Sequence, residues 1–290
     1  MREPNFFLVG APKCGTTALY EMLGEHPDVF VSPVKEPDFL AADLMAAVPR
    51  RAKDAVTGDA RYRRLFAAAE HERAVGEGSV SYLASLSAPA AIAGRCPDAR
   101  IIMVLRDPAA RLYSHHTAAW AAGATRETFR AWFDAQVRRR VEGAARFSPI
   151  TAGEYGSHLR RYLAHFPRSH ILVIWHEDFV RDAAAALRGV FAFLDVDPQH
   201  QVNAALRRND TRAPRWALPR PVHRAGAAVL SRVMPSEAWD RTRAWFRVPV
   251  RRRMPAGDRA LAIGVYEDDV AALAALTGRD LSAWLDAAAG

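Results

Sequence analysis

The sequence predicts an α/β fold with a central parallel sheet flanked by helices. The first observation is a set of three apolar runs, at residues 6–9, 100–105 and 171–175. They lack the polar alternation of half-exposed strands, which is typical of strands covered on both faces. The second observation is that each run is followed by a stretch with helical spacing of apolar residues. Alternation of strands and helices along a chain is typical of an α/β domain.

The composition is that of a globular protein with a large core. The chain has 290 residues, of which 50% are hydrophobic and 25% charged. We therefore expect one domain over residues 1–290. The formal net charge of +8 favours an anionic partner, and nucleotide, nucleic acid and membrane surface all fit that charge.

The two cysteines, Cys14 and Cys96, are too few for a disulfide scaffold and have no metal-binding spacing. We expect a reducing compartment and, because no stretch has the length of a signal or membrane segment, a cytoplasmic protein. Abundant alanine and arginine favour a bacterial source. Cys14 is either a reactive thiolate beside Lys13 or a small side chain that fills its loop.

Residues 5–23 predict a buried strand, a tight loop and a helix. Gly10 ends the strand, and Thr16 and Thr17 are typical residues for a helix start. Backbone N–H groups and the positive end of the helix dipole then point into the loop, where Lys13 adds a full charge. This arrangement predicts an anion-binding loop.

The loop almost fits the phosphate-loop pattern G-x-x-x-x-G-K-[ST], except that Thr16 stands where that pattern has lysine. A phosphate-loop kinase or NTPase needs that lysine together with magnesium. Instead, Ala11-Pro12-Lys13-Cys14-Gly15-Thr16-Thr17 resembles the 5′-phosphosulfate loop of sulfotransferases that use 3′-phosphoadenosine 5′-phosphosulfate (PAPS). The resemblance implies a P-loop-like three-layer fold and a donor site without metal.

In that resemblance, backbone N–H groups of Gly15, Thr16 and Thr17 hold the 5′-phosphate, and Lys13 stabilises charge on the bridging and leaving oxygens. Lys35-Glu36-Pro37-x-Phe39 resembles the segment of carbohydrate-type sulfotransferases, such as the heparan-sulfate enzymes, whose glutamate is the general base. Glu36 inherits this role by position. The alternatives are a surface Lys–Glu pair and a base at His115 or His116.

The second strong strand ends in the pattern Arg106-Asp107-Pro108-x-x-Arg111-x-x-Ser114. It resembles the sulfotransferase motif that holds the 3′-phosphate, with Arg106 and Ser114 as ligands. Arginine suits this role because its guanidinium binds phosphate with two hydrogen bonds. The alternatives are an Arg106–Asp107 ion pair and a magnesium site at Asp107.

Residues 74–82 resemble the family's second strand and turn, with Gly78 and Val80 where lysine and proline are common. Glu77 and Tyr82 either face the acceptor or pack inside. Beyond them we expect helices at 44–73, at 88–96 with Ser87 as the cap, at 153–166, at 183–194 and at 258–276. The aromatic residues Trp120, Phe129, Trp132 and Phe133 belong either to the core or to the acceptor pocket.

Residues 207–253 contain thirteen arginines against three acids, a local charge of about +10. This basic, variable stretch is a candidate lid or a surface facing the acceptor or a membrane, through which we expect peripheral membrane contact. A basic loop of the family closes over the nucleotide in this neighbourhood. Arg208, Asn209 and Arg212 are its candidates here.

Taken together, the motifs predict in-line transfer of a sulfuryl group from PAPS to an acceptor hydroxyl, with 3′-phosphoadenosine 5′-phosphate (PAP) as product. Glycans, lipids and secondary metabolites all offer such a hydroxyl, and nucleic acid is not expected as a partner. The alternatives are a phosphate-loop kinase or NTPase and a non-catalytic basic module that binds anions through residues 207–253.

Overall fold

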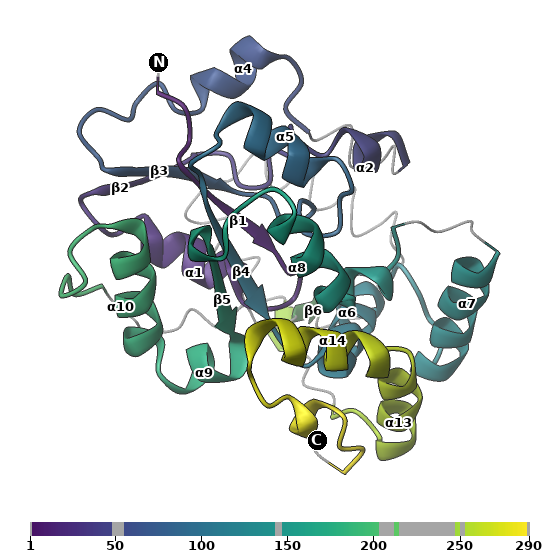
Figure 1. The fold of residues 1–290 in the computed structure, drawn as a ribbon. Coiled ribbons are helices and arrows are strands. Elements are labelled where there is room, and N and C mark those ends of the chain that lie inside the picture. Colours follow the sequence, from purple (N-terminus) through teal and green to yellow (C-terminus); the bar gives the residue numbers. More distant parts are fainter. Residues whose placement is uncertain are drawn as a thin grey trace.

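The computed structural model describes residues 2–47, 55–142, 147–202, 212–214, 247–249 and 253–288. In this part of the chain, five parallel strands form a central sheet flanked by helices, which confirms the predicted fold class (Figure 1). The strands are β1 (Phe6–Gly10), β2 (Val29–Val31), β3 (Ala74–Gly78), β4 (Arg100–Leu105) and β5 (Ile171–Trp175).

The strand order is β2-β3-β1-β4-β5, which places β1 at the centre. Phe6 pairs with Gly76 of β3 on one side and with Arg100 of β4 on the other. Because both edges and both faces of β1 are covered, its apolar run is fully buried. All five strands are parallel, so their carboxyl ends meet at one edge, where sheets of this kind bind ligands.

Helices cover both faces of the sheet (Figure 1). Helices α1 (Thr16–Leu23) and α10 (Ala183–Leu194) lie on one face, and α5 (Ala88–Arg95) and α8 (Tyr155–Leu163) on the other. The remaining helices are α2 (Ala42–Ala47), α4 (Asp59–Arg64), α6 (Pro108–Ala121), α7 (Phe129–Val141), α9 (His176–Arg181), α13 (Ala256–Gly264) and α14 (Glu267–Thr277).

The start of α5 differs from the sequence prediction in its cap. Ser87 stands at the N-cap position, but its hydroxyl donates to Asp43 Oδ1 at 2.7 Å instead of accepting from the helix. The first helical amide, Ala88 N, donates to Ser85 Oγ at 2.9 Å. The Ser87 hydroxyl therefore bonds Asp43 of α2 and does not cap α5 as the sequence pattern predicted. This bond connects α2 to the start of α5.

The single helix predicted for residues 258–276 is wrong, because the chain forms α13 and α14 with a break around Tyr266. The Tyr266 side chain is buried, and its hydroxyl donates to Ile150 O at 3.0 Å. Arg111 of α6 donates to the same hydroxyl at 3.3 Å. These long-range bonds hold Tyr266 inside, where a straight helix would not have placed it.

The two ends of the basic stretch meet in a short antiparallel pair of β6 (Arg212–Pro214) and β7 (Arg247–Pro249). Arg208 and Asn209 lie outside the described residues, and so does the side chain of Arg212. Among the helices that the structure describes, none combines the length and the apolar character needed to cross a bilayer.

Candidate functional site

The loop from Ala11 to Gly15 joins the central strand β1 to helix α1. Gly15 stands at the N-cap of α1 with φ 91°, a left-handed conformation that glycine adopts without steric cost. Its carbonyl accepts the helical bond from Leu19 N at 3.2 Å. No side chain of the described residues caps the first turn of α1. Its N–H groups and the positive end of the helix dipole therefore point into the loop, where an anion would be stabilised.

Side chains from the ends of two further strands hold this loop. Arg106 directly follows β4, and its Nη1 donates to Lys13 O at 3.4 Å. His176 directly follows β5, and its Nδ1 lies 2.9 Å from Cys14 O. The carboxyl ends of β1, β4 and β5 therefore meet at one cluster of basic residues, which is where the sequence motifs placed Lys13 and Arg106.

His176 belongs to this cluster although the sequence analysis did not name it as a site residue. Burial and the neighbouring Arg106 charge lower the pKa of His176 to about 4, so the ring is neutral at pH 7. Burial and Arg106 also lower the pKa of Lys13. The sequence signal that could have identified His176 as a site residue is its position directly after an apolar strand.

Cys14 is not the reactive thiolate that its position beside Lys13 allowed. Its side chain is fully buried, and its Sγ lies 3.7 Å from the hydroxyl of Tyr155. Burial raises the pKa of Cys14 to about 11, which outweighs the opposing effect of Arg111 and Arg106. Cys14 is therefore the small buried side chain that fills its loop, the other alternative from the sequence analysis.

Glu36 lies at the same edge of the sheet, one strand away from the loop. Its backbone N–H donates to Gly78 O at the end of β3 at 2.9 Å, and Gly78 is in register with Leu8 of β1. Its carboxylate pairs with Lys35 at 3.1 Å, and the Glu36 side chain is 33% exposed. The Lys–Glu pair of the alternative interpretation thus exists, at the edge where the site residues gather.

Lys13 and Glu36 both have an unusual backbone conformation. Among the described non-glycine residues, positive φ angles occur at Lys13 (71°), Glu36 (59°), Asp38 (53°) and Asp195 (63°). Aspartate tolerates this region, whereas lysine and glutamate do so much less often. Such strained positions cluster at functional sites. Two of these four residues are aspartates, which tolerate this conformation. The other two are Lys13 and Glu36, the residues that the motifs proposed as catalytic.

Glu77 and Tyr82 face the interior. Glu77 is fully buried and accepts hydrogen bonds from Tyr62 (2.8 Å), Tyr82 (2.7 Å) and Ser79 (2.6 Å). Burial raises the pKa of Glu77 to about 7, against the effect of these bonds. Ser79 Oγ also accepts from Asp38 N at 3.1 Å. This network fastens the segment that carries Glu36 to the end of β3.

Asp107 caps helix α6 through Oδ1, which accepts from the amides of Ala109 (2.9 Å) and Ala110 (3.0 Å). Its Oδ2 pairs with Arg259 at 2.7 Å. The alternative Arg106–Asp107 ion pair is therefore wrong for the described structure. Within the described residues, no group of three His, Cys, Asp or Glu side chains is placed to hold a metal ion.

Ser114 lies two turns into α6 and is partly exposed, as is Arg106. Arg111 between them is fully buried and donates to Pro149 O and Tyr266 Oη. Arg111 therefore differs from the two predicted phosphate ligands, because its guanidinium is directed into the protein and bonds the segments that follow α7 and α13.

His115 and His116 both pack against helix α7. The His115 ring is stacked on Trp132 with ring centroids 6.1 Å apart, and His116 Nε2 lies 3.1 Å from Glu127 O. Phe129 and Trp132 are themselves buried in the main core. For Phe129, Trp132 and Phe133 the structure supports the core interpretation, whereas Trp120 is partly exposed.

Comparison with known proteins identifies the family. The sequence profile described as "Sulfotransferase family" matches residues 4–200, more than half of the chain. The chain belongs to the sulfotransferase family. This assignment replaces the phosphate-loop kinase or NTPase of the sequence analysis, whereas residues 207–253, through which the alternative basic module would bind anions, lie outside the matched region.

The sulfotransferase has curated relatives in mouse that act on heparan sulfate. It is 33% identical over 193 residues to heparan sulfate glucosamine 3-O-sulfotransferase 6, covering 67% of this chain and 52% of that protein. It is 32% identical to 3-O-sulfotransferase 3A1, covering 66% and 45%. The chain thus spans about half the length of these relatives.

A solved structure resembles the sulfotransferase over almost its whole length. The sulfotransferase from Alicyclobacillus acidocaldarius superposes with a TM-score of 0.76 at 26% sequence identity, covering 99% of this chain and 100% of the other. The match includes the C-terminal helices beyond the residues that the family profile covers.

Proposed function

We propose that this sulfotransferase moves the sulfuryl group of PAPS to a hydroxyl group of its acceptor. The observation that carries the proposal is the cluster of Lys13, Arg106 and the uncapped start of α1 at one edge of the sheet. Burial and the Arg106 charge lower the pKa of Lys13, so this partly buried pair of basic side chains calls for an anion of more than one charge. A 3′,5′-bisphosphorylated nucleotide has that character.

In this proposal, the N–H groups of Gly15, Thr16 and Thr17 bind the 5′-phosphate at the start of α1. Lys13 stabilises charge on the bridging and leaving oxygens. Arg106 and Ser114 bind the 3′-phosphate and select PAPS over ATP by a charge that ATP lacks at this position. Neutral His176 contributes by fixing the Cys14 carbonyl, and with it the loop.

Glu36 is the general base. The acceptor oxygen forms a bond to sulfur, the bond from sulfur to the 5′-phosphate oxygen breaks, and its electron pair leaves with PAP. The acceptor proton passes to the Glu36 carboxylate. The rigid backbone of residues 36–38, held to the end of β3, keeps this carboxylate at the edge beside the loop.

The acceptor that we propose first is a glycan hydroxyl, because the curated relatives are named for transfer to a glucosamine oxygen of heparan sulfate. Lipids and secondary metabolites offer the same functional group, and loops outside the matched motifs choose among them. The basic stretch at 207–253 suits an acidic glycan or an anionic membrane surface.

Calorimetric titration tests the donor site. The purified protein is titrated with PAP without metal and, in parallel, with ATP and magnesium, both at moderate salt. We expect PAP to bind more tightly, since only PAP places a phosphate at Arg106 and Ser114. Tighter binding of magnesium ATP would contradict the donor assignment.

A further inference from the structure

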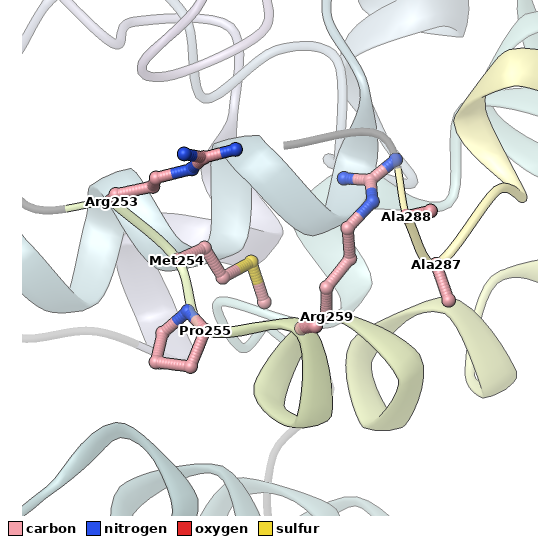
Figure 2. Close-up of a pocket in the computed structure, with 7 residues that line it drawn as sticks. Arg253, Met254, Pro255, Arg259, Ala287 and Ala288 are labelled. Atoms are coloured by element: carbon pink, nitrogen blue, oxygen red, sulfur yellow. The ribbon is translucent and has the colours of Figure 1, made fainter.

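Arg259 is a buried arginine near the start of helix α13, outside the region 4–200 that the family profile matches. Its side chain is 4% exposed and extends towards the C-terminal segment at Ala287 and Ala288 (Figure 2). Nε donates to Asp286 O at 2.7 Å, and Nη2 donates to Trp284 O at 3.2 Å. Burial of a charge at this position requires a compensating partner.

That partner is Asp107, 2.7 Å from Arg259 Nη1. Arg259 lines a hollow of about 360 Å³ together with Arg253 and Met254. Figure 2 shows the side chains of these three residues. All three nitrogens of the Arg259 guanidinium are engaged by protein oxygens. Arg259 therefore acts on Asp107 and the C-terminal segment, and the hollow gains no anion site from it.

Asp107 directly follows Arg106 in the chain, and its carboxylate is only 13% exposed. One oxygen is occupied by the cap of α6, so the other decides which cation the carboxylate neutralises. In the structure that cation is Arg259. Arg106 donates to the loop at the Lys13 carbonyl, and a carboxylate that interacts with it electrostatically is Glu177, whose Oε1 accepts from Asp107 N at 3.1 Å.

We propose that Arg259 is a positioning residue for the donor site, which holds the negative charge of Asp107 away from Arg106. Without Arg259, Asp107 would have no cation in contact among the described residues, and its poorly solvated carboxylate would pair with the neighbouring Arg106. The pair would weaken the grip of Arg106 on the 3′-phosphate. This inference rests on the proposed PAPS site.

The test is PAP binding by calorimetry in Arg259→Met, Asp107→Asn and the double variant. Arg259→Met is expected to raise the Kd for PAP about tenfold. Asn keeps the helix cap but removes the charge, so Asp107→Asn alone should bind PAP at least as well as the wild type. The double variant should return to within about threefold of the wild-type Kd, because the competing charge is gone.

Arg95→Met is the matched control, since Arg95 is also a partly buried arginine that pairs with two carboxylates, Glu3 and Asp59, at 2.7 and 2.6 Å. It should lower stability and leave the Kd for PAP unchanged. If Arg259→Met does not fold, Arg259→Gln is compared with Asp107→Asn/Arg259→Gln in the same way.

The outcomes distinguish failure of the proposed function from failure of the inference about Arg259. Wild-type protein that fails to bind PAP would overturn the proposed function and this inference with it. Wild-type binding together with unchanged binding by Arg259→Met would overturn the inference alone. Weak binding that Asp107→Asn does not restore would also overturn it, because Arg259 would then act only by anchoring the C-terminal segment.

Discussion

The edge of the sheet where the strands end carries basic side chains in one region, beyond β1 and β4, and two glutamates in a second region, at β3. Beyond β1 and β4 lie the cations Lys13 and Arg106, joined through the Lys13 carbonyl. At the end of β3 lie the carboxylates Glu36, whose amide bonds Gly78 O, and Glu77, which belongs to the strand itself. In our proposal the first region holds the anionic donor and the second removes the acceptor proton. The first region also contains a carboxylate, Glu177, whose Oε1 accepts from Asp107 N at 3.1 Å and which interacts electrostatically with Arg106.

Glu36 and Glu77 differ from each other in exposure and in hydrogen bonding. Glu36 is partly exposed and held in a left-handed backbone conformation, whereas Glu77 is fully buried and saturated by three hydroxyl donors. Only Glu36 can meet a substrate. Glu77 holds the segment on which Glu36 stands, so exposure separates the catalytic role that we propose for Glu36 from the structural role of Glu77.

The largest expected effect comes from Glu36→Gln. Loss of the general base should lower kcat roughly a thousandfold, while the Kd for PAP stays at the wild-type value. The measurement is PAP release with a heparan-type glucosamine oligosaccharide as acceptor. Lys35→Met is the control, since it removes the ion pair but keeps the carboxylate. Normal transfer by Glu36→Gln would redirect the search for the base to His115 and His116.

Lys13→Met tests the cationic region. Removing a charge that stabilises the leaving oxygens should lower kcat a few hundredfold, roughly the loss measured for single oxyanion-stabilising groups. Lys13→Arg should recover part of the rate if charge alone matters. The same PAP-release assay measures both variants, and equal rates for Lys13→Met and wild type would remove Lys13 from the site.

Arg106→Met is expected to act on binding more than on rate. Loss of a charge-assisted contact to the 3′-phosphate should raise the Kd for PAP about thirtyfold. Adenosine 5′-phosphosulfate, which lacks the 3′-phosphate, is the comparison ligand in the same titration. A variant that weakens both ligands equally would show that Arg106 acts through the loop it contacts and not through the 3′-phosphate.

Glu77→Gln is expected to change the pH dependence of stability. Since folding raises the pKa of Glu77 from 4.5 to about 7, the folded state binds its proton more tightly than the unfolded state. Its contribution is therefore most favourable below pH 4.5 and is lost as the pH rises to about 7, a change of about 3 kcal/mol. Urea unfolding between pH 4.5 and 8 should show this slope in the wild type and not in Glu77→Gln.

Exposed Glu21→Gln is the control for that experiment and should keep the wild-type slope. Equal slopes in the wild type and in Glu77→Gln would mean that Glu77 is ionised in the folded protein over the whole range. The comparison between the two carboxylates would then rest on exposure alone.

Local patterns predicted most of the elements. The apolar runs became β1, β4 and β5, and the helix predicted for 183–194 has those bounds as α10. These predictions succeeded because burial on both faces removes every polar residue from a central strand, a signal that needs no knowledge of partners. Where partners decide, the patterns failed, as at Ser87 and at the break before α14.

The sequence by itself determined the fold class and the positions of Lys13 on the loop after β1 and of Arg106 at the end of β4, because strand burial and helix starts depend on neighbouring residues. Only the tertiary structure decided which charges meet. It paired Asp107 with Arg259 instead of Arg106, brought His176 to the loop and enclosed Glu77 among Tyr62, Tyr82 and Ser79. Each of these contacts except Glu77–Tyr82 and Glu77–Ser79 joins residues far apart in the chain. Their energies depend on burial and distance, which spacing along the sequence does not encode.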